Sequence, residues 1–358
     1  ILHGAFSASD DRNSQQQAAQ ARVEDLAHRV EITPFMRECI KDFAEELIPI
    51  PGVLDPCGVE EVMEKQNRPR QRRHVSLGQL MLMFWAGVWV VLKKVAKPFV
   101  KKEAYGDVKD PRVVTQVDDG TKLALSMLLY PLHRLVFDRW GAVNEDGFLA
   151  CGLNPREIES AIVRKLEGKV AAANTDLSRF DARSSDPGRE LEKQLYLRAF
   201  NQEHRGFVLS ALDATYELKA IMPDGYCYDT DQTLVTGKPQ TSLMGSTQNA
   251  FMAYYSWRET VCLITKQKYT HKEAMKRLGI YLGDDGVNAK GPFDGNVDFS
   301  AGAKAFGHKM DISWVNEGEV GVTFLSRYYT ENVWTGAPDN CCDIIRQLSK
   351  IHTTVNIP

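Results

Sequence analysis

The stretch Tyr281-Leu282-Gly283-Asp284-Asp285-Gly286 constrains the fold of this 358-residue chain more than any other. Its pattern predicts a short strand, a tight turn that carries two adjacent carboxylates, and a second strand over 287–289. Glycine on both sides of the aspartates allows positive φ and the close approach of a ligand. Two adjacent carboxylates repel each other, so they favour a divalent cation, which prefers oxygen ligands. Taken alone, the stretch is better explained as a solvated β-turn.

Composition narrows the classes of function. The formal net charge of −3 creates no general attraction for nucleic acid, so any such binding must come from local patches. The seven cysteines include no C-x-x-C pair, which argues against a disulfide framework or a zinc site and suits a reducing compartment. The polar N-terminal region lacks the apolar core of a signal peptide, and Ile1 is not a start methionine. We therefore expect a piece of a longer polypeptide or a processed product.

One segment is strongly basic. Between Lys65 and Lys102 the chain contains many lysines and arginines and no acidic residue, which favours contact with phosphate groups. The apolar run at 80–92 within this segment is shorter than the roughly 20 residues that span a bilayer. We therefore expect a buried helix there, with a segment lying on a membrane surface as the alternative.

The other patterns predict helices and short strands in an α+β fold. Residues 1–22 are polar and predict a loosely ordered lead-in. The expected helices lie within 23–66 (broken at 48–56), within 121–170 (broken near 141–147), from Ser185 or Asp186 to near Gly206, over 242–263, before the Asp284 hairpin, and over 299–307. The expected strands are 171–177, a hairpin within 219–235, the hairpin at Asp284, 310–315 and 320–325.

Three other groups of residues have chemistry that suits a nucleotide. Asp176 stands at the end of the strand predicted at 171–177, where it can share a cation with a neighbouring hairpin, and Asp181 follows five residues later. The flexible loop predicted from Thr236 to Ser242 places hydroxyls at a helix N-terminus, which can hold a sugar hydroxyl or a phosphate. Basic residues within 99–112 offer several cations to a triphosphate. Each group alone also has a structural explanation: a turn or cap residue, a capped helix, and a solvated loop.

The order of these groups is more specific than any one of them. A basic loop, Asp-x4-Asp, Gly-x3-Thr before a helix and Gly-Asp-Asp on a hairpin resemble motifs F, A, B and C of the RNA-dependent RNA polymerases of positive-strand RNA viruses. The closest resemblance is to nodavirus-like and tombusvirus-like replicases. Residues 306–309 stand where this family has motif D, and residues 324–329 where it has motif E, which grips the primer end. The resemblance runs from about Phe99 to Tyr329.

The resemblance implies template-directed RNA synthesis from NTPs by two-metal-ion nucleotidyl transfer. Asp176, Asp284 and Asp285 are then the catalytic and metal-binding carboxylates for two Mg²⁺ ions, which Mn²⁺ can replace. Lys309 is the candidate for protonating pyrophosphate, with Lys304 as its competitor. The residues expected to bind substrate, near the triphosphate or the ribose, are Lys101, Lys102, Arg112, Asp181, Gly237, Thr241, Ser246 and Asn249. Asp181 is expected to accept a hydrogen bond from the ribose 2′-hydroxyl, the group that distinguishes RNA from DNA.

The resemblance also implies a right-hand polymerase fold with helical fingers and an antiparallel-sheet palm. Residues 1–170 are expected to form an N-terminal extension and the fingers, with a nucleotide-contacting loop at 99–112. Residues 171–340 are expected to form the palm, with a fingers insertion near 206–236, and 341–358 the start of a thumb that is largely absent. The implied partners are a viral RNA template and product strand, NTPs, and other replicase domains or a host membrane. The implied location is a membrane-associated replication complex in the host cytoplasm.

One position departs from motif B of the family. An asparagine four residues after the motif B threonine normally positions the aspartate that reads the ribose, but this chain has Gly245 there. Either Ser246 or Thr241 substitutes for that asparagine, or the helix is locally shifted towards Asn249. How ribose is selected is therefore left open by the sequence.

Two alternatives to an RNA polymerase have to be weighed. A reverse transcriptase uses the same metals, but Gly283 stands where reverse transcriptases typically have a bulkier apolar residue before the aspartate pair. A non-catalytic, RNA-binding replication scaffold with a palm-like fold is disfavoured because all three expected metal carboxylates are present.

Overall fold

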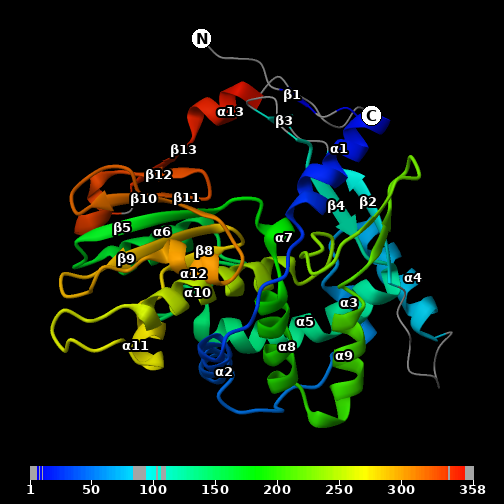
Figure 1. Cartoon of the computed structure of the whole chain (residues 1–358), viewed down its shortest axis with the longest axis horizontal. Helices are drawn as coiled ribbons and strands as arrows, with labels where there is room; N and C mark the ends of the chain where they lie inside the picture. The colour runs from blue at the N-terminus through cyan, green and yellow to red at the C-terminus, as the bar shows by residue number, and fades with distance from the viewer. Residues whose placement is uncertain are drawn as a thin grey trace.

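The computed structural model describes residues 6–7, 9, 11–83, 94–101, 104–105, 110–337 and 339–350 (Figure 1). These residues form the α+β fold expected from the sequence. A central four-stranded sheet lies on the left of Figure 1 and a second four-stranded sheet on the right, with helices packed between and below them. The two smaller sheets are the pair β1 (Phe6–Ser7) and β3 (Ala104–Tyr105), and the three strands β11 (Thr323–Phe324), β12 (Arg327–Tyr329) and β13 (Asn340–Cys342).

The central sheet is antiparallel, with the strand order β10-β5-β9-β8. Its strands are β5 (Ala171–Leu177), β8 (Ile280–Leu282), β9 (Asp285–Lys290) and β10 (Met310–Asn316). Side chains alternate between the two faces of a strand, so Ala173 and Leu177 face the main core whereas Ala172 faces a second core. The hairpin β8–β9 and the strand at 171–177 are therefore confirmed.

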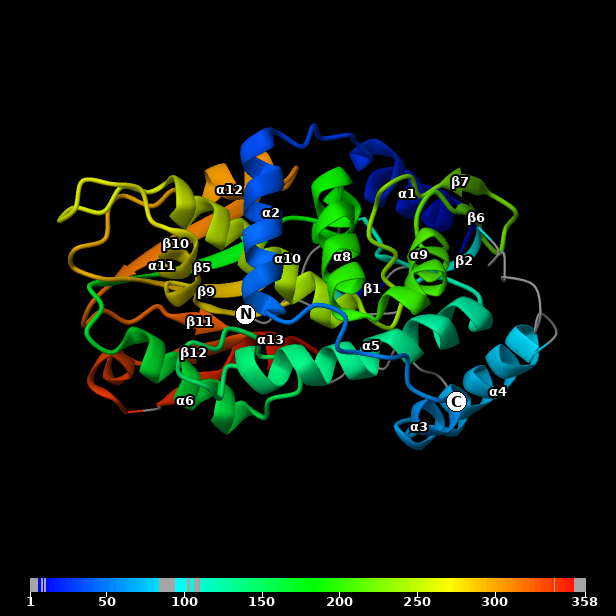
Figure 2. The same ribbon diagram turned by 90° about the horizontal axis from the view of Figure 1, so that it is seen from below.

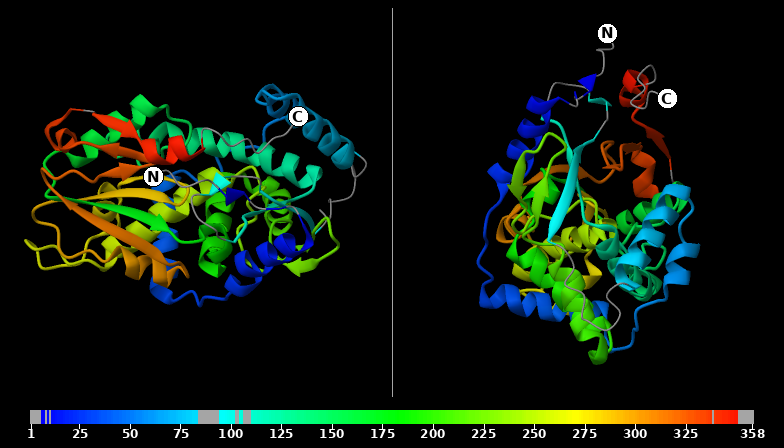
Figure 3. Two further views of the ribbon diagram at one scale, coloured as in Figure 1. Left: turned by 90° about the horizontal axis from the view of Figure 1, so that it is seen from above. Right: turned by 90° about the vertical axis from the view of Figure 1, so that its right-hand side faces the viewer.

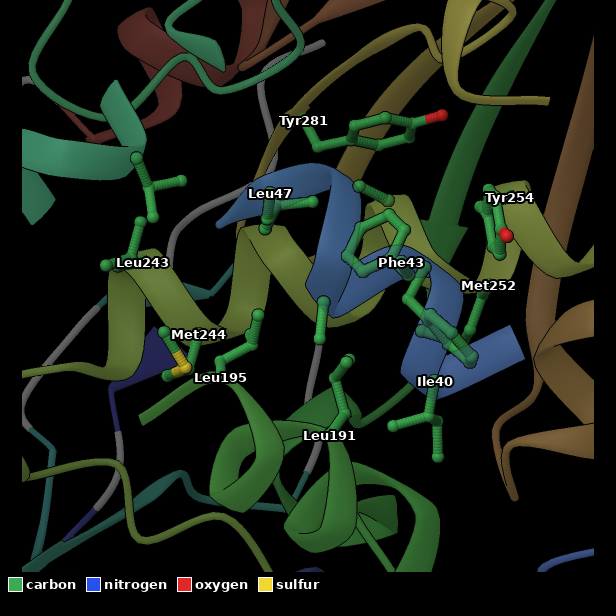
Figure 4. Close-up of a cluster of buried hydrophobic side chains, with 14 of the residues drawn as sticks. Ile40, Phe43, Leu47, Leu191, Leu195, Leu243, Met244, Met252, Tyr254 and Tyr281 are labelled. Carbon is green, nitrogen blue, oxygen red and sulfur yellow. The ribbon is translucent and has the colours of Figure 1, made fainter. Parts of the chain in front are cut away.

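Helices cover the lower face of this sheet. They are α2 (Pro34–Leu47), α8 (Asp186–Ala199), α10 (Thr241–Glu259), α11 (His271–Lys276) and α12 (Phe299–Ala305). Figure 2 shows α2 and α8 side by side beneath the sheet, with α10 between them and the strands. Phe43 of α2 packs edge-on against Phe251 of α10, with ring centroids 5.3 Å apart, and Leu191 and Leu195 of α8 join the same cluster (Figure 4). Burial of such side chains is the main stabilising contribution, about 1.5–3 kcal/mol each.

The upper face of the sheet is only partly covered. Helix α6 (Pro155–Leu166), strands β11 and β12, and the 3₁₀ helix η3 (Glu331–Thr335) pack on one end of it. The left panel of Figure 3 views the molecule from this side. The last helix, α13 (Ile344–Lys350), follows β13. The uncovered end of this face carries the acidic residues described below.

The second sheet has the order β4-β2-β6-β7. Its strands are β2 (Val95–Val100), β4 (Val113–Gln116), β6 (Lys219–Ile221) and β7 (Cys227–Asp229), and only the β2–β6 pair is parallel. The hairpin predicted within 219–235 is thus confirmed. Helix α1 (Arg12–Arg22) packs on this sheet through the buried Ala18 and Ala19. The expectation of a loosely ordered N-terminus is wrong for 12–22, because small side chains let this polar helix approach the strands closely.

The remaining helices surround the two sheets. They are α3 (Val59–Glu64), α4 (Pro69–Met83), α5 (Asp119–Trp140), α7 (Phe180–Arg183) and α9 (Arg205–Asp213), with the 3₁₀ helices η1 (Glu24–Leu26) and η2 (Gln202–His204). The buried helix expected at 80–92 can be compared with the structure only over residues 80–83. These residues form the end of α4, and Leu80 is exposed, whereas 84–93 lie outside the described residues. Within the described part, no helix combines the length and apolar character needed to cross a membrane.

Three predicted elements differ in extent or pairing. Helix α8 ends at Ala199 and not near Gly206, because Phe200 is extended and bridges Leu54. Helix α10 ends at Glu259, and the next residues bend back so that Val261 bridges Lys268. The strand predicted at 320–325 shortens to β11 and pairs with β12 outside the central sheet.

Candidate active site

Three aspartates stand in one row across the central sheet. Asp311 of β10 pairs in register with Asp176 of β5. On the other side of β5, Thr175 pairs with Gly286 of β9. Continuing this antiparallel register by one residue sets Asp176 opposite Asp285, the first residue of β9. Directly opposed residues point to the same face, with Cβ atoms about 4.5–5.5 Å apart. The sheet register therefore brings together carboxylates that are over a hundred residues apart in sequence.

The turn between β8 and β9 adds Asp284 to this row. Gly283 has φ +62°, a left-handed conformation that glycine adopts without strain. Gly286 is required for a different reason, since a Cβ atom there would lie 2.5 Å from the Thr175 hydroxyl oxygen. The two glycines predicted to flank the acidic pair thus have separate functions, one for the turn and one for close packing on β5.

Burial and the charges of neighbouring aspartates raise the pKa values of Asp176 and Asp285. Burial, followed by the charges of Asp284 and Asp176, raises the pKa of Asp285 to about 6, an effect that Arg346 of α13 opposes. Burial and the charges of Asp284 and Asp311 raise the pKa of Asp176. In the described part of the chain the carboxylate oxygens of Asp176, Asp284 and Asp285 do not all lie within 4.8 Å of one another. Clustered oxygen donors with raised pKa values are a donor set that fits a divalent cation.

Helix α10 holds the acidic turn from below. The side-chain amide of Asn249 donates to the carbonyl oxygens of Gly283, Asp284 and Asp285 at 3.1, 3.0 and 3.3 Å. The Ser246 hydroxyl accepts from the backbone N–H of Gly283 at 2.9 Å. Both side chains were expected to bind substrate, but they are fully buried and bonded to the turn backbone. Their position is that of supports for the turn.

Gly245 packs closely against a neighbouring aromatic ring. A Cβ atom at this position would lie 3.1 Å from the ring of Phe180 in α7 and 3.5 Å from the Cα atom of Gly283. The Phe180 ring, which also stacks on His308, occupies the space that a larger residue would need. Asn249 lies one helical turn further on, where its amide reaches the acidic turn and not Asp181.

Cationic side chains surround Asp181 in α7. Burial and the charge of Asp284 raise the pKa of Asp181 to about 7, whereas Arg112, Lys238 and Lys101 lower it. The structure therefore brings Lys101 and Arg112 close to Asp181, and the backbone N–H of Lys101 donates to the carbonyl oxygen of Arg112 at 2.8 Å. Lys102 lies outside the described residues.

The loop that precedes α10 is closely packed. The backbone N–H of Gly237 donates to the Thr115 carbonyl oxygen at 2.8 Å, and a Cβ atom at Gly237 would lie 2.5 Å from that oxygen. The Thr241 hydroxyl donates to the carbonyl oxygen of Lys238 at 2.8 Å. Gly237 is thus needed where the loop crosses β4, and Thr241 closes the loop on itself.

The two lysine candidates for proton transfer are both exposed. The carbonyl oxygen of Lys309 accepts from the backbone N–H of Ser178 at 3.0 Å, so its backbone borders the end of β5. Lys304 lies in the last turn of α12. The backbone of Lys309 thus contacts the residue that directly follows β5, the strand that carries Asp176.

Several residues of the site were not predicted from the sequence. Asp311 is one, although the strand expected at 310–315 placed it at a position that can pair with β5. Lys238 and Arg346 are others, because only the fold sets their charges beside Asp181 and Asp285. A separate group, Asp55, Glu203 and His204, has ligand atoms within 4.8 Å of one another, but it forms a partly exposed ion pair distant in sequence from the aspartate row.

A row of carboxylates on adjacent strands suits the two-metal chemistry that phosphatases, nucleases and polymerases share. Sequence comparison agrees: the model of the viral RNA-dependent RNA polymerase family matches residues 110–356, and the chain belongs to this family. The resemblance inferred from the motifs is therefore confirmed.

Curated relatives are RNA-directed RNA polymerases of viruses. Those of striped jack nervous necrosis virus, Pariacoto virus and Flock house virus are 28, 26 and 25% identical to the chain over 340, 352 and 308 residues. The matches cover 94, 96 and 85% of this chain but only 31, 33 and 29% of the relatives. The chain thus spans about a third of their length.

Proposed function

We propose that this chain is the catalytic core of a replicase that synthesises RNA from NTPs on a viral RNA template. The observation that carries the proposal is the register of the central sheet, which sets Asp176 against the turn of Asp284 and Asp285. Family membership favours this function over reverse transcription and over a non-catalytic scaffold. In this proposal 171–340 form the palm, 1–170 with the insertion near 206–236 form the fingers, and 341–358 begin the thumb.

The acidic row is the proposed metal site. Asp176, Asp284 and Asp285 would hold two Mg²⁺ or Mn²⁺ ions, which when bound lower the pKa of a primer 3′-hydroxyl and neutralise charge on the triphosphate. Asn249 and Ser246 fix the backbone of the turn, so that the two aspartates keep their positions when a substrate binds. Positioning of this kind is a large part of the catalysis of phosphoryl transfer.

The residues beside the acidic row bind the nucleotide in this proposal. Lys101 and Arg112 contact the triphosphate, and Asp181 accepts a hydrogen bond from the ribose 2′-hydroxyl. Lys309 donates a proton to the departing pyrophosphate, and Lys304 is its competitor. Viral RNA, other replicase domains and a host membrane in the cytoplasm are the proposed partners and setting.

A primer-extension assay on an RNA template with Mg²⁺ tests the function. We expect the wild-type chain to incorporate NTPs, and the variants Asp284→Asn and Asp285→Asn to fall to background. Asp55→Asn is the matched control, because it removes an exposed carboxylate outside the acidic row and should leave incorporation unchanged. Equal incorporation by the wild type and the two acidic-row variants would exclude the catalytic assignment, and a preference for dNTPs would favour reverse transcription.

A further inference from the structure

Lys238 is a buried lysine in the loop between β7 and α10. Its side chain is 0% exposed, and its ammonium nitrogen lies 2.9 and 3.0 Å from the two carboxylate oxygens of Glu192, whose side chain is 1% exposed. The sequence predicts a flexible loop here, and a lysine in such a loop normally reaches solvent. Full burial of both charges means that this part of the loop has one fixed position.

The Glu192 carboxylate joins three segments of the chain. It lies in α8, accepts a hydrogen bond from the Tyr216 hydroxyl after α9, and accepts another from the Gln240 amide at 3.4 Å. The Lys238 ammonium also lies 5.1 Å from the centroid of the Tyr216 ring, in a cation–π contact. Three neutral or cationic donors therefore satisfy a single buried carboxylate, which makes the junction rigid.

This junction fixes both sides of the proposed ribose site. Helix α8 follows α7, which carries Asp181, after the two extended residues Ser184 and Ser185. The Thr241 hydroxyl donates to the carbonyl oxygen of Lys238, so the loop and the start of α10 move together. The charge of Lys238 also acts on the Asp181 carboxylate. The position of Asp181 relative to Thr241 therefore depends on the ion pair between Glu192 and Lys238.

Helix α10 offers no side chain from position 245 to replace this arrangement, since Gly245 faces the Phe180 ring and Gly283. We propose that Lys238, held by Glu192, is a specificity-determining positioning residue that sets Asp181 and Thr241 for recognition of the ribose 2′-hydroxyl. The inference rests on the proposed polymerase function and deepens it. In this proposal the buried ion pair positions Asp181, as the motif B asparagine expected at position 245 would do.

The test compares the full chain with Lys238→Met, Glu192→Gln and the double variant. In the single variants one buried group loses its partner, so a lower Tm is expected as well as altered selectivity. In the double variant both charges are gone and the amide introduced at position 192 can still bond the Tyr216 hydroxyl, so Tm should return towards the wild-type value. Lys193→Met, which removes the neighbouring lysine of α8, is the matched control and should change neither quantity.

Two readouts are measured for each protein: the ratio of kcat/KM for ATP over dATP in primer extension, and the difference in Tm produced by ATP and by dATP with Mg²⁺. We expect the ratio to fall about 10-fold or more in Lys238→Met and to stay low in the double variant, through a higher KM for ATP, because one hydroxyl contact is lost. The excess stabilisation by ATP over dATP should disappear in parallel.

Recovery of the wild-type ratio together with Tm in the double variant would overturn the inference, since the pair would then be only structural. An unchanged ratio in Lys238→Met would overturn it too. If the folded wild type incorporates no nucleotide, the proposed function fails, and the thermal-shift readout still decides the inference: a preference for ATP that is lost in Lys238→Met supports it, and an equal response of both proteins refutes it.

Discussion

Replacing Asn249 with alanine should separate the support of the acidic turn from general stability. The Asn249 side chain is 0% exposed, and its amide group donates to three carbonyl oxygens of the turn. An NH₂ group has two hydrogens, so two of these bonds can be made at full strength. Each contributes about 1 kcal/mol, and the carbonyl oxygens left without a donor add to the cost.

The expected loss of stability is about 2 kcal/mol. The cost is limited because the amide oxygen of Asn249 is buried without a recorded partner among the described residues, and the substitution removes it. A loss of this size lowers Tm by about 3 °C in a chain of this length. The functional effect should be larger, since a shift of about 1 Å in catalytic groups costs on the order of 10²-fold in rate.

Thermal unfolding and primer extension are the two assays. Thr247→Ala is the matched control: Thr247 is equally buried in α10, but its hydroxyl donates only to the Leu243 carbonyl oxygen of the same helix, at 2.8 Å. It should lower Tm with little change in the rate at a temperature where both proteins are folded. If Asn249→Ala polymerises as fast as this control, the amide does not position the turn.

Three further predictions concern the neighbourhood of the site. Asp285→Asn should raise the Tm of the metal-free protein at pH 8. The folded pKa of Asp285 is raised to about 6, so its charge destabilises the folded state above that pH, and this effect is lost as the pH falls towards 4. An unchanged Tm in differential scanning fluorimetry would contradict this prediction. His308→Phe should reduce the loss of stability between pH 7 and pH 5 in urea unfolding by about 2 kcal/mol. Burial, reinforced by the charges of His28 and Arg183, lowers the folded pKa of His308 to about 3. The wild type therefore loses stability as the pH falls below about 6.5, the pKa of histidine in the unfolded chain. Equal losses of stability in both proteins would refute this prediction. Gly245→Asn should lower Tm and activity by displacing Phe180, at a cost of about 1–3 kcal/mol, and a stable, active variant would show that the ring can move aside.

Many elements of the central region could be predicted from local sequence signals. Pro187 at the start of α8, the alternation along β5 and the glycines around Asp284 each act over a few residues. Elements whose stability comes from distant partners were predicted poorly. Helix α1 is polar and forms because Ala18 and Ala19 pack on the second sheet, and β11 leaves the central sheet because it pairs with β12.

The same division applies to the site. The order of the motifs predicted Asp176, Asp181, Asp284 and Asp285 as site residues, since residue type and spacing are properties of the sequence. The support of the turn by Asn249 was not predicted, because donor and acceptors lie 34 to 36 residues apart. The pairing of Lys238 with Glu192 spans 46 residues, and nothing in the loop itself indicates that its lysine is buried.

The amino-acid sequence by itself determined the chemistry of this protein: which acidic, basic and hydroxyl groups are present, in which order, and on which local turns and helices. Only the tertiary structure decided which of them are exposed to a substrate and which are buried supports. The physical reason is that backbone conformation depends on neighbours in the chain, whereas strand register, burial and charge pairing depend on neighbours in space. Asp311 opposite Asp176 and Lys238 against Glu192 are consequences of the second kind.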